Sequence, residues 1–466
     1  MKNLQLFSIA LLMSLGMFAQ PTWQVGNTTL TEYDLVTGVQ VPWEILWGQD
    51  DHIWATERRG RVLRIDPTTG NYTTVLDLTN LIPDNGQGEP GMLGMAQHPD
   101  WENEQKMFIV YNYQNGFQIR ERLSTFEWNG TELVNEEAIL DDIPGWWIHN
   151  GARILMLPDN TLLLTTGDVG DGGVSSQTLS SLNGKVLRMN LDGSIPADNP
   201  FPNSLVYSWG HRNSQGLCLG PNGLIYSSEH GQSNHDEFNI IEAGANYGWP
   251  DVEGFCNTPS EQTFCDENDV IEPLEAWSPC IAVNGIEYYD HPAIPEWQNS
   301  VLMAVLGGLG AQYERLSVLH MSDDGTQIES EDQYFSEFNQ RVRDICVNPN
   351  TGAVYVALNG PGYPGNGPNI IKEFVNEAYL SVEETTTLSQ NVKVYPVPAT
   401  ADLTMEFSDD FLGTSFQVIS FDGRVVGRFV VAENRVRMNV SDWAAGQYYL
   451  SATTEKGTIT RTFVVQ

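Results

Sequence analysis

The sequence predicts an all-β protein, a β-propeller followed by a small β-sandwich. The chain of 466 residues contains 43 Gly, 13 Trp and 17 Tyr and few long runs of Ala, Leu, Lys and Glu. This composition is typical of many short strands joined by turns. A turn-and-strand pattern recurs along most of the chain, as it does in propeller blades. A change of composition near residues 376–391 then separates this region from a final set of alternating strands.

The N-terminus has the features of a secretory signal peptide. Met-Lys-Asn is followed by an apolar run from Leu4 to Phe18, and Ala19 precedes polar residues. This run is too short to span a bilayer as a helix, and no later segment is apolar enough to do so. We therefore expect residues 1–19 to be a signal peptide and the mature protein to be exported without membrane insertion.

Four segments share an Asp/Asn/Gly turn followed by an apolar strand. They are GQDDHIWATERRGRVLRID (48–66), PDNTLLLTTGD (158–168), PNGLIYSSEHG (221–231) and PNTGAVYVALNG (349–360), with HPDWENEQKMFIVYNY (98–113) as a longer variant. The copies recur at roughly sixty-residue intervals or multiples of them, as expected for four-stranded blades with long insertions. A β-sandwich also has many short strands, but it does not explain so regular a unit over so long a stretch.

Polar blocks between His149 and Pro250 indicate a ligand site. Each block places Arg, His, Asn or Gln beside Gly, a combination that core-building strands do not need. The blocks are WIHNGAR (147–153), GKVLRMNLDGSIPADNPF (184–201), GHRNSQG (210–216), SSEHGQSNHDE (227–237) and NYGWP (246–250). Because the blades of a propeller converge on a central channel, loops from distant parts of the chain meet at its mouth. We expect these blocks to be such loops around a polar ligand.

Charge excludes one class of partner. The formal net charge of −37 argues against a nucleic acid or an anionic membrane, because both require clustered Lys and Arg.

The five cysteines leave at least one thiol unpaired. Cys256 and Cys265 bracket a polar loop and are the expected disulfide in an exported chain, with Cys280 as a competitor for either position. Cys218 and Cys346 lie in apolar, strand-like segments and are expected to be buried thiols. The spacing fits no zinc site.

Residues 392–466 contain short alternating strands, and Asp422-Gly423 is a hairpin signal between two apolar runs. We expect a separate small β-sandwich there, because about 75 residues suffice for such a domain. The predicted organisation is a propeller at 20–375, a linker at 376–391 and the sandwich at 392–466.

The motifs of the main region resemble those of the soluble PQQ-dependent sugar dehydrogenases, the glucose/sorbosone dehydrogenase family of six-bladed propellers. VPWEILWG, ATERRGRVLRID, GEPGMLGMAQHPDW, GKVLRMNLDGSIPADNP, GHRNSQGL, HDEFNII, NYGWPDVEG and NQRVRDI follow in the family's order. The C-terminal region is similar to the sorting domain of the type IX secretion system, through VYPVPAT, ISFDGRVV, SDWAAGQYYLS and the terminal FVVQ. Val397 stands there between two prolines, where that domain usually has Asn.

The resemblance assigns roles to three residues of the polar blocks. His149 would be the general base that takes the proton from the C1 hydroxyl of a sugar, a role that suits a neutral imidazole. Arg212 and Asn213 would hold quinone and substrate oxygens, with Arg212 stabilising the charge that develops on the quinone. The structural alternatives are a buried His bonded to a carbonyl and a turn whose polar side chains cap strand ends.

The resemblance also implies calcium. The backbone carbonyls of Gly231 and Gln232 would bind the ion that also grips the cofactor, an oxygen set that suits a hard cation. Asp236, Glu237 and the carbonyl of Tyr247 would hold a second, structural calcium. Simple solvation of two surface acids is the alternative for that second site.

Two arginines are implied as cofactor anchors. Arg341 and Arg343 alternate along NQRVRDI and so point to one face of a strand. Two guanidinium groups on a channel wall suit a tricarboxylate such as PQQ. The alternative pairs one of them with Asp344 or another acid.

Three positions depart from the glucose dehydrogenases of the family. No Lys occurs in 301–316, where a PQQ-binding Lys would fall near Gly307 or Gly308. Glu89 stands in place of a substrate-side Gln, and Ile148 in place of an acidic residue beside the base. These departures favour the broader aldose dehydrogenase branch, or a member of the family whose cofactor binding has weakened.

The resulting expectation is an exported oxidoreductase, secreted or on the cell surface. It would oxidise the C1 hydroxyl of an aldose to a lactone with calcium-bound PQQ as hydride acceptor. An external electron acceptor and the type IX secretion machinery would be its partners. A calcium-stabilised binding propeller without redox activity and a calcium-dependent lactonase are the alternatives.

Overall fold

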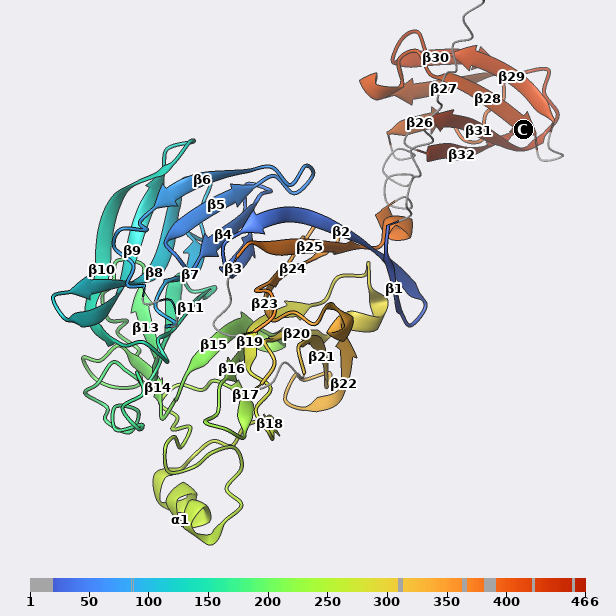
Figure 1. The fold of residues 1–466 in the computed structure, drawn as a ribbon. Coiled ribbons are helices and arrows are strands. Elements are labelled where there is room, and N and C mark those ends of the chain that lie inside the picture. The colour runs from blue at the N-terminus through green and yellow to red at the C-terminus, as the bar shows by residue number, and fades with distance from the viewer. Residues whose placement is uncertain are drawn as a thin grey trace, which may run out of the picture. The chain divides into compact units, whose positions relative to one another are not determined.

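The computed structural model describes residues 20–84, 86, 88–308, 313–362, 367–380, 391–420, 424–454 and 457–466. The chain divides into two compact units, one ending at Val375 and one beginning at Asn376 (Figure 1). Strands dominate both units, so the all-β prediction is confirmed. The predicted signal peptide, most of the predicted linker and the Asp422-Gly423 turn lie outside the described residues.

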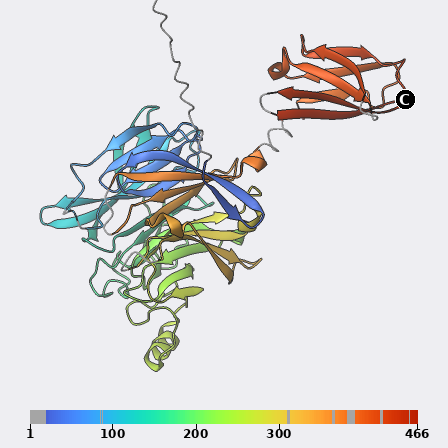
Figure 2. The same ribbon diagram turned by 45° about the vertical axis from the view of Figure 1, so that its right-hand side comes forward.

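The N-terminal unit contains six antiparallel sheets in its described part (Figures 1 and 2). Four consecutive strands form each of the first three: β3 (Pro42–Trp47), β4 (Ile53–Glu57), β5 (Arg61–Ile65) and β6 (Tyr72–Asp77); β7 (Met92–Gln97), β8 (Lys106–Asn115), β9 (Gln118–Trp128) and β10 (Leu133–Gly145); β11 (Gly151–Met156), β12 (Thr161–Thr166), β13 (Lys185–Asn190) and β14 (Val206–Trp209). The next two follow the same rule: β15 (Ser214–Leu219), β16 (Ile225–Glu229), β17 (Asp236–Ile240) and β18 (Glu275–Trp277); β19 (Val283–Tyr289), β20 (Ser300–Val305), β21 (Arg315–Met321) and β22 (Ile328–Tyr334).

The sixth sheet joins the two ends of the unit. Its strands are β23 (Val342–Val347), β24 (Val354–Leu358), β25 (Asn369–Val375), β2 (Thr28–Val39) and β1 (Thr22–Val25). The N-terminal β2 pairs with the C-terminal β25, from Thr31 opposite Val375 to Val39 opposite Asn369. This pairing gives β2 a hydrogen-bonded neighbour and leaves fewer open edges.

One strand of each sheet, which we call its inner strand, takes part in a closed ring of packed strands. β3 packs on β7, β7 packs on β11, and the series continues through β15, β19 and β23 back to β3. The strands near this ring are almost continuously apolar and buried, as in β7 and β20, because neighbouring sheets cover both of their faces. The ring therefore brings six segments that are distant in sequence to a common centre.

A buried charged cluster occupies part of the ring. Arg153 on β11 pairs with Glu44 on β3 at 2.7 Å and with Asp344 on β23 at 3.1 Å. Burial raises the pKa of Glu287 on β19 to about 8, and the nearby Asp344 and Glu44 carboxylates add to the rise.

The raised pKa of Glu287 predicts a pH-dependent stability. Between its unfolded value of 4.5 and about 8, the folded state keeps a proton that the unfolded state releases, so stability falls as pH rises. We expect Glu287→Gln to remove on the order of 3 kcal/mol of this fall between about pH 5 and 8, measured as the unfolding free energy of the N-terminal unit. Exposed Glu102→Gln is the control. A wild-type pH slope in Glu287→Gln would contradict the prediction.

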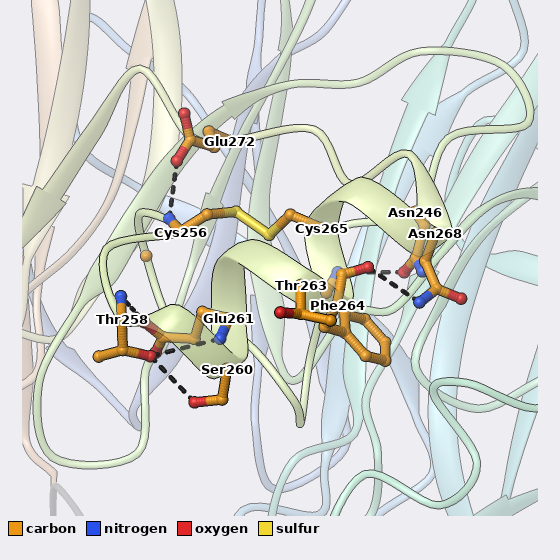
Figure 3. Close-up of a disulfide and its surroundings, with 12 residues drawn as sticks. Asn246, Cys256, Thr258, Ser260, Glu261, Thr263, Phe264, Cys265, Asn268 and Glu272 are labelled. Atoms are coloured by element: carbon orange, nitrogen blue, oxygen red, sulfur yellow. Dashed lines mark hydrogen bonds between the residues drawn. A yellow bond between two sulfur atoms is a disulfide. The ribbon is translucent and has the colours of Figure 1, made fainter.

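The predicted disulfide between Cys256 and Cys265 is confirmed (Figure 3). Cys218 and Cys346 are buried thiols, and Cys280 is a partly buried one. The expected polar loop between the bridged cysteines contains a helix instead, α1 (Pro259–Asn268). Thr258 accepts from Glu261 N–H and Glu261 accepts from Thr258 N–H, a capping box that with Pro259 starts the helix.

Short 3-10 turns complete the described elements: η1 (Pro221–Gly223), η2 (Pro295–Trp297), η3 (Ser336–Phe338) and η4 (Asp409–Phe411). None of the helices in the described part of the chain has the length and apolarity that crossing a membrane requires.

The C-terminal unit has two antiparallel sheets. One contains β26 (Val392–Tyr395), β27 (Asp402–Phe407) and β30 (Arg435–Asn439); the other contains β29 (Val425–Val430), β28 (Ser415–Ser420), β31 (Gly446–Thr454) and β32 (Gly457–Val465). Buried and partly exposed residues alternate along β27 and β28. The buried sets share one core that includes Met405, Phe416 and Leu450, so this unit has its own hydrophobic interior.

Candidate functional site

A cavity of about 670 Å³ lies where the six inner strands begin. Its wall contains residues at or just before the start of each: Trp43, Glu89, His149, Arg212, Ala282 and Arg341. We call it the central cavity. The closed ring explains its place, because the six connections that enter the inner strands meet at one end of the ring.

His149 has a carboxylate partner that fixes its ring. Its Nδ1 lies 2.7 Å from Oδ1 of Asp168, whose side chain is 1 % exposed. Asp168 also accepts hydrogen bonds from Gly170 N–H and from Trp249 Nε1. Burial raises the pKa of Asp168, but the hydrogen bond and charge of His149 and these donors outweigh it, so the pKa lies below its usual value. An ionised Asp168 accepts a hydrogen bond from Nδ1–H, and in the neutral ring this tautomer carries its lone pair on Nε2.

The backbone around His149 is also fixed. His149 has a φ of 55°, in the left-handed region, and its N–H donates to Oε2 of Glu89 at 2.8 Å. Glu89 N–H in turn donates to the carbonyl of Trp147. The Glu89 carboxylate thus supports a turn that brings His149 to the cavity wall, and such conformations are concentrated at functional sites.

Four arginines line the described part of the central cavity: Arg58, Arg212, Arg341 and Arg343. Arg343 is 7 % exposed and stacks on Trp43 at 4.5 Å. Burial and the neighbouring Arg153 charge lower its pKa well below the usual value. Within the described residues, Nε of Arg212 and Nη2 of Arg343 are buried without a hydrogen-bond partner. Buried donors without acceptors are costly, so this wall is suited to an anionic ligand that supplies oxygen atoms.

Asp344, the competing acid for these arginines, is bonded elsewhere. It pairs with Arg153 and accepts from the N–H of Ile45.

Asn213 and His230 complete the wall beside Arg212. Asn213 Oδ1 accepts from Gly151 N–H at 3.1 Å, and its carbonyl accepts from His230 N–H. Burial, with the charges of Arg212 and Arg343, lowers the pKa of His230 well below its usual value. His230 is therefore a neutral group in a cationic wall.

Gly231, Gln232 and Asp236 all lie on the cavity wall. Asp236 accepts from Gly231 N–H at 2.8 Å and from the N–H groups of Ile281 and Ala282 at 2.7 and 2.5 Å. Its carboxylate therefore orders the backbone of the wall.

Glu237 lies apart from Asp236, since consecutive residues of β17 face opposite sides of the sheet. Burial and the nearby Glu229 raise the pKa of Glu237 to about 8. Tyr247 stacks on His211, which pairs with Glu229 at 2.8 Å. The structure thus brings Glu237 and Tyr247 to the surroundings of Glu229, and Asp236 to the central cavity.

The predicted residues His149, Arg212, Asn213, Gly231, Gln232, Asp236, Arg341 and Arg343 all line the central cavity, whereas Glu237 and Tyr247 do not. Sequence reasoning did not identify Asp168, Arg58, His230, Tyr313 or Glu314. Asp168 ends the segment TTGD, two residues after the buried strand β12. A polar residue so close to the end of a buried strand is the one signal that could have identified it.

The fold and the cavity define an all-β protein with a cationic ligand site at the centre of a ring of sheets. Residues 39–363 match the model of the glucose/sorbosone dehydrogenase family, and residues 393–466 match that of a secretion-system C-terminal sorting domain. The chain belongs to the glucose/sorbosone dehydrogenase family and carries this sorting domain.

Individual relatives agree with this assignment. The chain is 31 % identical over 360 residues to a protein of Synechocystis sp., covering 72 % of this chain and 85 % of that one. It is 35 % identical over 251 residues to quinoprotein glucose dehydrogenase B of Acinetobacter calcoaceticus, covering 47 % and 52 %. The PQQ-bound aldose sugar dehydrogenase of Streptomyces coelicolor has a TM-score of 0.61 and 30 % identity, covering 74 % of this chain and 96 % of that one.

Proposed function

We propose that the protein is an exported PQQ-dependent oxidoreductase that oxidises the C1 hydroxyl of an aldose to a lactone. One observation carries the proposal. The His149–Asp168 pair shares one cavity with Arg212 and Arg343, each of which has one buried nitrogen atom without a partner in the described residues. A base and a set of anion-binding donors in one cavity are what a hydroxyl oxidation with an anionic cofactor requires.

The fold that we propose for this activity is a six-bladed propeller over residues 20–375, with the six sheets as blades. A linker at 376–391 would lead to a β-sandwich at 392–466. Residues 1–19 would serve as a signal peptide, and the sandwich would direct passage through the type IX machinery to the cell surface or the medium. The match of residues 393–466 to a sorting domain supports this route.

The residues of the cavity fit PQQ. Its carboxylates would meet Arg341 and Arg343, and Arg212 and Asn213 would hold quinone and substrate oxygens. The carbonyls of Gly231 and Gln232 would hold calcium, since neither accepts a hydrogen bond in the described part of the chain. When bound, PQQ supplies the two-electron acceptor. A structural calcium was expected at Asp236, Glu237 and the Tyr247 carbonyl. Because Asp236 lines the central cavity and the other two do not, we propose Glu237 and the Tyr247 carbonyl alone for it.

His149 is the proposed base. Its Nε2 would accept the proton of the C1 hydroxyl, and Asp168 would stabilise the imidazolium that results. Arg212 would stabilise negative charge that develops beside it.

The Asp168→Asn substitution tests which ring nitrogen of His149 carries the proton. An amide can donate to Nδ1 and so move the proton to Nε2, and we expect kcat for aldose oxidation to fall by about 10²-fold or more. The PQQ dissociation constant is expected to stay within about twofold, because Asp168 acts through His149. Steady-state dye reduction measures kcat, and a PQQ titration measures the dissociation constant. An unchanged kcat and pH profile would contradict the assigned tautomer.

A non-catalytic binding propeller is the second candidate, favoured by one observation. The resemblance places a cofactor-binding Lys near Gly307 or Gly308. A Cβ at Gly307, whose φ is +79°, would lie 2.8 Å from Glu314, and a Cβ at Gly308 would meet the carbonyl oxygen of Cys280.

The two candidates differ in turnover. The purified chain, loaded with PQQ and calcium, would be incubated with a panel of aldoses and an artificial electron acceptor, and the products identified by mass spectrometry. The proposal expects dye reduction with stoichiometric lactone. Binding of PQQ and sugar without dye reduction would favour the second candidate.

A further inference from the structure

Glu314 is a buried carboxylate of the central cavity that the proposed chemistry does not use. It is 5 % exposed and lines the cavity wall. Within the described residues its carboxylate has neither a hydrogen-bond donor nor an ion-pair partner. The two other acids of the wall differ from it, because Glu89 accepts from His149 N–H and Asp236 from three backbone N–H groups. The carboxylate faces the cavity and receives no hydrogen bond from the described residues, so it is available to a ligand that donates to it.

The backbone holds Glu314 in this position. A Cβ at Gly307 would lie 2.8 Å from Cδ of Glu314, so the carboxyl group fills the space above this glycine. Arg315 follows, and its guanidinium binds Glu331 at 2.8 Å and the carbonyl of Tyr313 at 3.2 Å. Glu314 therefore lies on a wall that is fixed from both sides.

Tyr313 presents an aromatic face beside this acid. It lines the same cavity and is 47 % exposed, although large aromatic side chains are usually more buried. Its φ of 91° is costly for a residue with a side chain. An aromatic ring and a buried acceptor thus stand next to each other in a strained segment.

The charges of the cavity indicate whether Glu314 binds the cofactor or the sugar. An anionic cofactor is suited to the four arginines and is repelled by a carboxylate. A sugar offers several hydroxyl donors and a face of C–H groups, which a carboxylate and an aromatic ring match in turn. Resting on the function proposed above, we propose that Glu314 accepts hydrogen bonds from ring hydroxyls of the aldose and that Tyr313 packs on its apolar face. The two residues then determine which aldoses the site accepts.

Glu314→Ala separates sugar recognition from cofactor binding. We expect it to raise KM for the preferred aldose by about 10- to 100-fold, the effect of a lost hydrogen bond to a charged acceptor. The PQQ dissociation constant, from an absorbance titration, is expected to stay within about twofold. Tyr313→Ala is expected to raise KM by about 3- to 10-fold.

Deoxy sugars identify the interaction itself. In wild type, at least one monodeoxy aldose should have a KM raised by the same factor as Glu314→Ala raises KM for the parent aldose. In Glu314→Ala, removal of that hydroxyl should raise KM no further, as a double-mutant cycle requires. Glu337→Gln, an exposed acid outside the cavity, is the control of similar charge change.

Two results would overturn the proposal. One is a PQQ dissociation constant weakened tenfold or more in Glu314→Ala with KM unchanged, which would assign Glu314 to the cofactor or to a cation beside it. The other is a KM unchanged for every aldose.

Saturation-transfer NMR of the aldose on the PQQ-free chain keeps the test independent of turnover. A transfer signal that the wild type gives and Glu314→Ala does not give supports the proposal, even where the wild type neither binds PQQ nor reduces dye. A transfer signal of equal strength in the two proteins contradicts it.

Discussion

His149→Ala is expected to lower kcat for aldose oxidation by about 10²- to 10⁴-fold, the range for loss of a general base. The expectation follows from geometry. The Nδ1 of His149 is held by a buried, ionised Asp168 at 2.7 Å, so that Nε2 is the basic atom of the ring. Stopped-flow dye reduction with PQQ-loaded protein measures the effect. The PQQ dissociation constant is expected to remain within about threefold, because the arginines that bind the cofactor are unchanged.

The matched control is His320→Ala. His320 forms a comparable pair with Asp332 at 3.0 Å but does not line the central cavity. The kcat of the His320→Ala variant is expected to equal that of wild type. Loss of PQQ binding in His149→Ala, with the fold intact, would assign His149 to the cofactor and contradict its role as the base.

Arg343→Met is expected to weaken PQQ binding by about 10²- to 10³-fold, since a buried guanidinium and a carboxylate form strong paired hydrogen bonds. The same substitution is expected to stabilise the PQQ-free protein. Arg343 is 7 % exposed, its pKa is lowered by burial and by Arg153, and its Nη2 has no partner among the described residues. Replacing such a charge by an apolar side chain of similar length removes a desolvation cost.

Absorbance titration gives the affinity, and thermal unfolding without PQQ gives the stability. Arg122→Met is the control, because Arg122 pairs with Asp141 outside the central cavity. An unchanged PQQ affinity in Arg343→Met would contradict the proposed cofactor site.

The fold class was accessible from the sequence because its signals are local. Each turn-and-strand segment carries its own pattern of Gly, Asn and buried aliphatic residues. Of the five polar blocks, 147–153 and 210–216 stand where β11 and β15 begin, and 227–237 also reaches the central cavity, whereas 184–201 and 246–250 contribute no residue to its wall. The alternation of Arg341 and Arg343 is also local, and both residues line the central cavity.

Other features depend on tertiary packing that no local pattern encodes. The pairing of Asp168 with His149 is a contact between residues that lie on different segments, and the space above Gly307 is filled by Glu314 from the far end of the β20–β21 connection. Asp236 and Glu237 are neighbours in sequence, but the pleat of β17 sends them to different surroundings. The α1 helix is a different case, since Thr258, Pro259 and Glu261 are a local signal that the disulfide spacing obscured.

The central claim is that the cavity binds PQQ and uses it to oxidise an aldose. Its most direct test is a titration of the purified chain with PQQ in the presence of calcium, followed by absorbance and then by dye reduction on addition of aldose. We expect a saturable spectral change at about micromolar PQQ, a concentration typical of a well-formed cofactor site, and reduction of the dye by at least one aldose. No spectral change at that concentration would contradict it.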